Sequence, residues 1–372
     1  MITVKLFAGE AGIRALAPAW RSLTAQLKFK RHFHHVEWHL ALAHTFERHN
    51  LAPLHCLAVF SDADKLVAAF PFRLARTQIG PIQLNVIRLA SDHIDAQTAR
   101  DFVISPDLTE SGFFQGFVRY MAESDAAWDV IELPGLLGDS AALATLKHCP
   151  ELPILSGPGG AWGRVEFISC GDHDRPLERL SKGFRQNLRT SSNKLKSSQV
   201  MFEAARTEID LVKLLAEFLK VESSGWKGEQ GTSVLKTPAA TTFARQLISQ
   251  FAPSESCEIH VMRVDSEPVA AMFGIVTDNI WYIFRIGYDE AYHRASPGHL
   301  IIENLLKQRA THKSFDTVTP YNAPPWFRAW KPDRTLQIFN AYIFRPSPQG
   351  VELANRVAAI LSGPAPPGSG AI

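Results

Sequence analysis

The sequence predicts a mixed α/β fold built from two domains, each with a central mixed sheet flanked by helices. Its 372 residues exceed the size of one ordinary domain. Short runs of β-branched and aromatic residues alternate with helical stripes in both halves. A breaker-rich segment, SGPGG at 156–160, predicts a boundary near the middle of the chain. We therefore expect domains at 1–155 and 161–348, and a disordered tail at 361–372.

Composition and charge limit the function classes. With 46% apolar and 20% charged residues, the chain is typical of a globular protein that buries a large core. A net charge of +2 argues against nucleic acid as the main partner. The sequence contains neither a signal-peptide pattern nor an apolar stretch of the roughly 20 residues that span a membrane. We therefore expect a cytoplasmic protein.

Neither the cysteines nor the histidines predict a metal site. The four cysteines stand far apart without a CxxC pair, which is typical of reduced, structural residues in a cytosolic protein. Four histidines lie close together at positions 32, 34, 35 and 39. No HExxH or partner carboxylate pattern accompanies them, and a helix surface explains them. We therefore expect no metal.

Four helices and five strands are expected in the first half. The strands at 54–60 and 65–76 flank Ser61-Asp62-Ala63-Asp64, which predicts a hairpin. Thr109 is a candidate cap for the helix at 108–123. In chain order the expected elements are a strand at 3–7, helices at 12–27 and 35–47, strands at 54–60, 65–76 and 84–89, a helix at 108–123, a strand at 128–133 and a helix at 140–148.

The second half repeats this alternation. A second hairpin is expected where Asp265-Ser266-Glu267-Pro268 separates two apolar runs. In chain order the expected elements are a strand at 165–168, a helix at 177–196, a strand at 200–204, helices at 208–221 and 241–251, strands at 258–264, 269–276 and 280–288, a helix ending before 311, and strands at 315–318 and 336–344.

The strand at 280–288 leads into a helix through the turn Ser296-Pro297-Gly298-His299. The amides of a first helical turn point outward, and the helix dipole adds positive potential, so this turn is a candidate phosphate site. Gly298 would let a ligand approach the backbone, and it permits an unusual φ. An ordinary strand-to-helix turn with a proline near the first helical position explains the same residues.

The order of hairpin, central strand, turn, helix and two further strands is that of the GNAT acyltransferase core. Three segments carry a more specific resemblance: FRQNLRTSSNKLK at 184–196, ESSGWKGEQGTS at 222–233 and YDEAYHRASPGHLI at 288–301. Through them the chain resembles the CelD/BcsL-type acetyltransferases linked to cellulose and exopolysaccharide synthesis. The resemblance covers most of the second half, and the first half only by pattern. Like the related Fem-type aminoacyltransferases, such proteins place two GNAT-like domains side by side.

The resemblance implies that acetyl-CoA or another acyl-CoA is a co-substrate, with its pyrophosphate bound by the backbone after the central strand. The matching positions are Arg294, Ala295, Ser296, Pro297, Gly298, His299 and Leu300. Here Arg294 could add a charge-assisted hydrogen bond and His299 could donate from the first turn.

Tyr321 lies near where many GNAT enzymes keep a tyrosine that protonates the departing thiolate; a turn tyrosine beside Asn322 is equally compatible. The family often has a Tyr-Lys pair before a tryptophan. Here the order is Tyr321, then Trp330-Lys331, so the lysine comes after the tryptophan. We therefore do not assign Lys331 the role of the family's lysine.

The segment at 222–233 is the candidate acceptor site. Trp226 and Lys227 place an aromatic ring and a cation on a glycine-hinged loop, which suits acceptor recognition. Glu222 is the candidate general base, because a protonated amine has no lone pair with which to attack the thioester. A helix end followed by a surface loop, with Trp226 as a packing anchor, is the alternative interpretation.

The helix at 177–196 carries Arg185, Arg189 and Lys196 on one stripe. This stripe could bind the phosphates of a nucleotide-linked or lipid-linked sugar, or an anionic membrane. A helix face that is simply exposed to solvent has the same pattern of residues.

Together these features predict an acyl-CoA-dependent N- or O-acyltransferase whose acceptor is a sugar-linked or exopolysaccharide precursor of the cell envelope. We expect it in the cytoplasm, at the periphery of the inner membrane, and in a polysaccharide-synthesis complex. The alternative is a non-catalytic scaffold or regulator with the same double fold.

Overall fold

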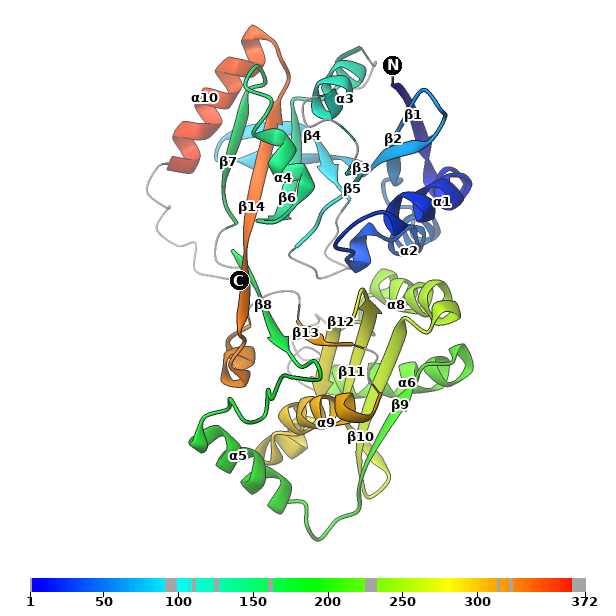
Figure 1. Cartoon of the computed structure of the whole chain (residues 1–372), viewed down its shortest axis with the longest axis vertical. Helices are drawn as coiled ribbons and strands as arrows, with labels where there is room; N and C mark the ends of the chain where they lie inside the picture. Colours follow the sequence, from blue (N-terminus) through cyan, green and yellow to red (C-terminus); the bar gives the residue numbers. More distant parts are fainter. Residues whose placement is uncertain are drawn as a thin grey trace.

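The computed structural model confirms the predicted fold class, a mixed sheet flanked by helices (Figure 1). It describes residues 2–90, 99–106, 108, 112–123, 127–159, 163–224, 233–312, 315–320 and 324–362. The first half contains β1 (Thr3–Ala8), α1 (Gly9–Ala25), η1 (His32–His34), α2 (Val36–Arg48), β2 (His55–Phe60), β3 (Leu66–Ile79), β4 (Ile82–Leu89), β5 (Val103–Ile104), α3 (Gly112–Glu123), β6 (Val130–Leu137), α4 (Ala141–Leu146) and β7 (Ile154–Pro158).

The second half begins at β8 and ends in a helix. Its elements are β8 (Arg164–Ser169), α5 (Lys182–Asn193), β9 (Val200–Ala205), α6 (Glu208–Ser224), α8 (Pro238–Phe251), η3 (Ala252–Ser254), β10 (Cys257–Val264), β11 (Glu267–Thr277), β12 (Ile280–Tyr288), η4 (Glu290–Ala295), α9 (Pro297–His312), β13 (Thr317–Thr319), η5 (Pro325–Trp330), β14 (Arg334–Phe344) and α10 (Pro348–Ser362).

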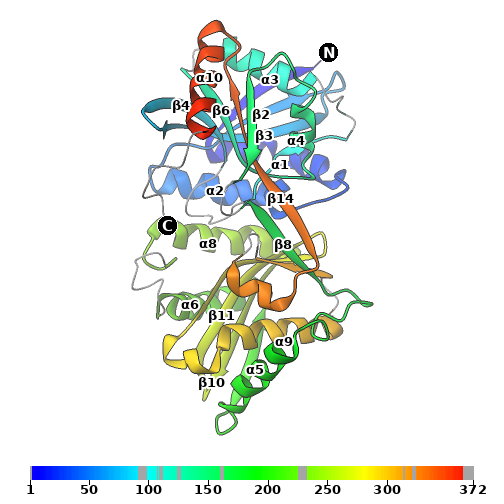
Figure 2. The ribbon, with the colours of Figure 1, turned by 90° about the vertical axis from the view of Figure 1, so that its left-hand side faces the viewer.

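One long strand connects the sheets of the two halves. The strand order is β1-β2-β3-β4-β6-β14-β8-β13-β12-β11-β10-β9, with β5 on β3 and β7 on β14. Residues 338–344 of β14 pair with β6 and β7, whereas residues 334–337 pair with β8. In Figures 1 and 2, β14 runs from one half of the molecule into the other. The pairs β4–β6 and β12–β13 are parallel, so the sheet is mixed.

The two faces of the second-half sheet pack against different helices (Figure 2). On one face, α6 and α8 share an apolar core with α1 and α2 of the first half. Within it, the ring of Trp38 from α2 meets the ring of Phe243 from α8 edge-on, with centroids 5.1 Å apart. On the opposite face, Leu188 of α5 and Leu305 of α9 share a core with Trp281 of β12. A continuous apolar core therefore joins the halves.

Most elements lie within a few residues of their predicted positions, but β7 and α10 were not predicted. The breaker-rich segment at 156–158 is part of β7, which pairs with β14 over residues 339–343. Helix α10 packs through Ala354 and Val357 against strands of the first half. Leu361 and Ser362 end α10, and the rest of the expected tail lies outside the described residues. The domain limits at 155, 161 and 348 stay predictions.

Helix α5 begins later than predicted. Its first residue is Lys182 rather than Leu177, because Ser181 caps the helix by accepting a hydrogen bond from the Phe184 amide at 3.1 Å. Thr109, the predicted cap of α3, lies outside the described residues.

Candidate functional site

The candidate site forms where β12 separates from its neighbour. Strand β13 pairs with β12 only over residues 280–282, although β12 continues to Tyr288 along β11. In the described part of the chain, no strand pairs with this edge of β12 beyond Tyr282. The two strands therefore separate at this point, and the end of β12 lies apart from β13.

A β-bulge determines which side chains face which helix. Phe273 of β11 pairs with Arg285, and the next residue, Gly274, pairs with Ile283, so Phe284 is an extra residue in β12. Before the bulge, the odd-numbered Ile283 packs toward α9; after it, the even-numbered Ile286 and Tyr288 do so. This one-residue change turns Gly287 toward α6.

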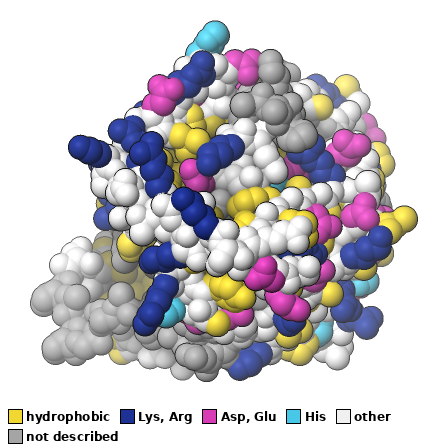
Figure 3. All heavy atoms as spheres, turned by 90° about the horizontal axis from the view of Figure 1, so that it is seen from below, with side chains coloured by type: hydrophobic (Ala, Val, Ile, Leu, Met, Phe, Trp, Pro, Cys, Tyr) yellow, Lys and Arg dark blue, Asp and Glu magenta, His cyan; other side chains and the backbone are white. Residues whose placement is uncertain are grey.

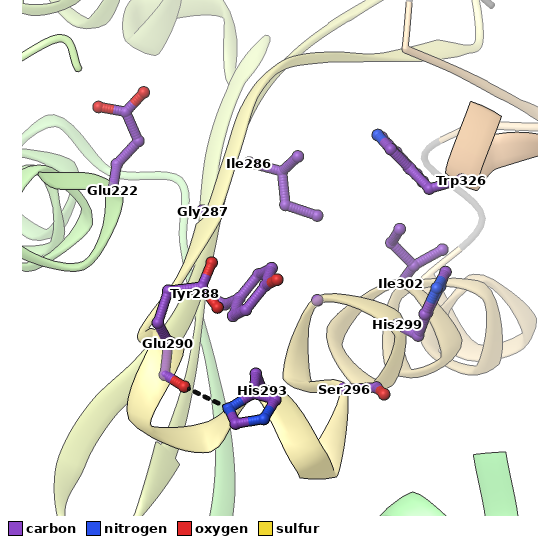
Figure 4. Close-up of a pocket in the computed structure, with 11 residues that line it drawn as sticks. Glu222, Ile286, Gly287, Tyr288, Glu290, His293, Ser296, His299, Ile302 and Trp326 are labelled. Atoms are coloured by element: carbon purple, nitrogen blue, oxygen red, sulfur yellow. Dashed lines mark hydrogen bonds between the residues drawn. The ribbon is translucent and has the colours of Figure 1, made fainter. Parts of the chain in front are cut away.

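A cavity of about 370 Å³ opens beside this edge. Its described lining comes from the end of α6, the end of β12, η4, the start of α9, and η5: Glu222, Ile286, Gly287, Tyr288, Glu290, His293, Ser296, Gly298, His299, Ile302 and Trp326. Figure 4 shows Glu222 on one side of β12, and Ile286, His299, Ile302 and Trp326 on the other. The cavity thus links the predicted phosphate turn with the predicted base.

The backbone of the turn before α9 differs from expectation in one respect. The unusual backbone conformation belongs to Ser296, at φ 47° and ψ 51°, and not to Gly298. Pro297 is the first helical residue, as its sequence position predicts. The amide of Gly298 has no hydrogen-bond partner among the described residues, whereas the His299 amide donates to the Ser296 carbonyl at 2.9 Å.

His299 is held as a neutral ring. Burial lowers its pKa, and its Nδ1 accepts a hydrogen bond from the indole N–H of Trp330 at 3.2 Å. A neutral imidazole that accepts at Nδ1 carries its proton on Nε2. Phe184 of α5 packs edge-on against both rings, with centroids 5.2 Å from each. His299 therefore supplies a donor to the cavity without adding a charge.

Glu222 is only 1% exposed and sits at the end of α6. Its Oε2 accepts a hydrogen bond from the Val234 amide at 2.7 Å. Gly287 allows the helix to approach, since a Cβ there would lie 2.7 Å from the Glu222 Cα. The position of this carboxylate is therefore set by β12 and by the chain near Val234.

The other predicted cofactor residues do not line the cavity. Arg294 is exposed, and its carbonyl accepts from Lys194 Nζ at 2.6 Å. Ala295, Pro297 and Leu300 are buried. Among the described lining residues there is neither a lysine nor an arginine. Within the described cavity lining, positive potential therefore comes from the helix N-terminus and its amides, with the exposed Arg294 beside the turn.

Three predicted site residues, Trp226, Lys227 and Tyr321, lie outside the described residues. Arg185 and Arg189 are exposed on α5 and do not line the cavity.

Sequence reasoning missed several lining residues. Neither Tyr288 nor Trp326 was predicted as a site residue, although both line the cavity. His293 also lines it, and its Nδ1 lies 2.8 Å from the Glu290 carbonyl, the contact dashed in Figure 4. An aromatic residue at the end of the central strand was the available signal for Tyr288.

The expectation that a helix surface explains the four histidines is wrong. His32, His34 and His39 are buried, and the His32 ring meets the Tyr282 ring of the second half at 4.8 Å. Burial lowers the pKa of His35 and His39 to about 4. Among the described residues, no group of three or more His, Cys, Asp or Glu side chains could hold a metal ion.

Comparison with known proteins agrees with this geometry. Residues 182–322 match the protein family described as "Acetyltransferase (GNAT) domain". The second half carries a GNAT domain. The match begins at α5 and includes the β10–β11 hairpin, β12, the turn, α9 and β13. No curated protein matches the chain in sequence. The more specific resemblance to CelD/BcsL-type enzymes stays a prediction.

Solved structures resemble both halves of this GNAT-containing chain. FemX shares 10% identity and a TM-score of 0.56, covering 88% of this chain and 96% of its own. A conserved Bacteroides thetaiotaomicron protein of unknown function shares 10% identity and a TM-score of 0.54, covering 88% of this chain and 97% of its own.

The third structure is the C-terminal domain of an Agrobacterium fabrum protein named as a lysylphosphatidylglycerol synthetase. It shares 11% identity and a TM-score of 0.53, covering 94% of this chain and 97% of its own. At such identities these likenesses show the fold.

Within the described residues, no helix is both long and apolar enough to cross a membrane.

Proposed function

We propose that the protein is an acyltransferase that moves an acyl group from acetyl-CoA or another acyl-CoA to an amine or hydroxyl. The observation that carries this proposal is the single cavity at the separated edge of β12, with the α9 N-terminus on one side and Glu222 on the other. Its volume of about 370 Å³ suits a small-molecule ligand.

The donor phosphates would lie at the turn between η4 and α9. The amide of Gly298 and the Nε2–H of His299 would donate to phosphate oxygens, and the helix dipole would add positive potential. Arg294 is exposed beside the turn, from where a flexible guanidinium could reach a phosphate. Glu290 lines the same cavity, so we place the phosphates nearer to α9 than to this carboxylate.

Acyl transfer would take place along β12. The acceptor nitrogen or oxygen forms a bond to the thioester carbonyl carbon and loses its proton to Glu222. An amide of β12 would polarise the carbonyl and stabilise the oxyanion. The carbon–sulfur bond then breaks, and the coenzyme A thiolate takes a proton, which we assign to Tyr321. Most of the catalytic effect would come from positioning the two substrates.

For the acceptor we propose a sugar-linked or exopolysaccharide precursor of the cell envelope, contacted by Trp226 and Lys227. A fold neighbour named for making lysylphosphatidylglycerol, a lipid that carries an amino acid, supports an envelope acceptor. The proposal includes a cytoplasmic location at the periphery of the inner membrane, within a polysaccharide-synthesis complex.

Two measurements test the proposal. Calorimetric titration of the full chain with acetyl-CoA and with coenzyme A should show binding. A thiol-release screen over amino sugars, nucleotide sugars and polysaccharide fragments should then find an acceptor that accelerates thiol release. Binding without transfer to any acceptor would leave the acceptor class open. No binding of either ligand at millimolar concentration would favour the non-catalytic scaffold.

A further inference from the structure

Helix α5 and the turn after it form a strongly basic stretch of the surface. Five cations lie between Ser181 and Phe202, and this stretch contains no Asp or Glu: Lys182, Arg185, Arg189, Lys194 and Lys196. All five are exposed. None of them forms an ion pair within the described part of the chain, whereas nearby cations such as Arg179 and Lys307 pair with Asp333 and Glu303. The positive charge of α5 is therefore uncompensated.

The orientation of α5 is fixed by its apolar side. Leu188 and Leu195 are buried in the core shared with α9, and Phe184 packs against His299 and Trp330. The helix therefore cannot rotate its cations inward. Arg294 extends the basic surface, because its carbonyl binds Lys194 Nζ at 2.6 Å. In Figure 3, viewed from below, dark-blue side chains gather on the side where Figure 1 places α5.

We infer that this basic surface of α5 binds the anionic headgroups of a phospholipid membrane. The 12 residues of α5 span roughly 18 Å at the helical rise, and Lys194 and Lys196 follow directly in the turn after it. The cations follow a convex helix and do not converge on one point. A single phosphate needs converging donors, whereas a planar array of headgroups can meet a row of cations.

An exposed apolar side chain on the same side of the sheet favours a membrane over nucleic acid. Phe202 of β9 follows the basic stretch, is 37% exposed, and lines a small hollow together with Leu195 and Leu300 on the α5 side of the sheet. At a membrane such a side chain can enter the boundary between headgroups and acyl chains. Against a phosphodiester backbone it would gain little.

The basic surface of α5 also lies next to the candidate site. Phe184 lies on α5 and touches His299 of the cavity, so a bound membrane would lie close to the candidate site. This inference extends the proposed peripheral location. It is independent of acyl transfer, because thiol release with a water-soluble acceptor needs no lipid.

The test measures partitioning of the full chain onto sedimented vesicles of phosphatidylcholine, with or without phosphatidylglycerol. We expect binding only to the anionic vesicles, and release at high salt. Each cation at a membrane surface changes partitioning by roughly five-fold, so the double variant Arg185→Gln/Arg189→Gln should bind about 25-fold more weakly. The variant Arg185→Lys/Arg189→Lys keeps the charge and should bind like the parent.

A matched control removes the same charge from the first half. Arg76 and Lys147 are exposed, and Arg76→Gln/Lys147→Gln should change vesicle binding less than about two-fold. Thermal melts establish that all three variants are folded.

Four results would overturn the inference. The first is no binding to anionic vesicles, and the second is an equal loss in the control variant. The third is tighter binding to duplex DNA or RNA than to vesicles. The fourth is loss of binding in the lysine variant together with competition by inorganic phosphate, which would indicate a discrete phosphate site that needs the arginine fork.

Discussion

The carboxylate of Glu222 has a structural partner, the Val234 amide, and a proposed chemical one, the acceptor proton. A substitution can separate the structural role of this carboxylate from its proposed chemical role. Gln keeps an oxygen that accepts the Val234 hydrogen bond but has little basicity. We expect Glu222→Gln to lower turnover by roughly 10²–10⁴-fold while coenzyme A affinity and the melting temperature stay close to those of the parent. Steady-state kinetics, calorimetry and thermal melts measure these three quantities.

Glu222→Ala is the comparison variant. It leaves the Val234 amide without this acceptor and should cost about 1–3 kcal/mol of unfolding free energy as well as activity. Full activity in Glu222→Gln would show that Glu222 has only the structural role.

Gly298 tests the donor side of the cavity. A Cβ at this position would meet Tyr288 Cδ1 at 3.4 Å, an ordinary contact, so a larger residue can fit without moving the backbone. The methyl groups of valine would occupy cavity space beside the Gly298 amide. We expect Gly298→Val to weaken coenzyme A binding at least about ten-fold by calorimetry.

The thermal stability of Gly298→Val should change little, and Gly298→Ala should lose less affinity. If Gly298→Val binds coenzyme A like the parent, the phosphates lie elsewhere. Arg294→Ala tests the guanidinium separately. If it binds a phosphate of coenzyme A, the variant should lose about 1.5–3 kcal/mol of binding free energy.

At the level of elements, the close packing of α6 on β12 positions the site. Because a Cβ at Gly287 would lie 2.7 Å from the Glu222 Cα, Gly287→Ala must move the helix or the strand. We expect a loss of about 1–3 kcal/mol in unfolding free energy, measured in urea, and a fall in turnover.

Gly183 of α5 provides the control for Gly287, since a Cβ there meets nothing within 4 Å. Gly183→Ala should leave stability unchanged or raise it slightly, because alanine favours helix. Equal stability of Gly287→Ala and Gly183→Ala would show that the α6–β12 contact tolerates an added methyl group.

Local sequence signals predicted much of the fold, whereas the site residues stay predictions. Hairpins and amphipathic helices are encoded within a few residues, and most of them lie within a few residues of their predicted positions; α5, which begins at Lys182, and the predicted turn, most of which is the first turn of α9, differ. The β7–β14 pairing joins residues 154–158 to residues 339–343, and such distant partners leave no local pattern. The unusual φ was expected at glycine but occurs at Ser296, where the surrounding structure imposes it.

The histidines show a further limit of local patterns. The spacing of residues in a sequence predicts which of them share a face of a helix. It does not predict whether another part of the chain covers that face. His39 lies on a face of α2 that the rest of the protein covers, and it is 2% exposed.

Over the whole molecule, buried histidines near the junction of the halves link stability to pH. Burial lowers the pKa of His39 from 6.5 to about 4. Between these two pH values the unfolded chain binds a proton that the folded protein does not, so stability falls as pH falls through this window. The expected loss is about 3 kcal/mol at the acid end for this residue.

His39→Gln isolates that contribution. Glutamine can still donate to the Phe33 carbonyl, which lies 2.8 Å from His39 Nε2, but it does not titrate. Urea unfolding at several pH values should show the parent losing about 3 kcal/mol more than the variant between pH 7 and 4. Parallel curves for the two proteins would contradict a buried, neutral His39.

The path of β14 links folding to the order of synthesis. The first half leaves the ribosome first, yet its strands β6 and β7 pair with residues 338–344, which are made near the end of the chain. At about 5–20 residues per second, these strands wait on the order of 10 to 40 s for their partner. During that time their unpaired edges can associate with other nascent chains. A chaperone that covers strand edges would therefore act on the first half before the GNAT domain is complete.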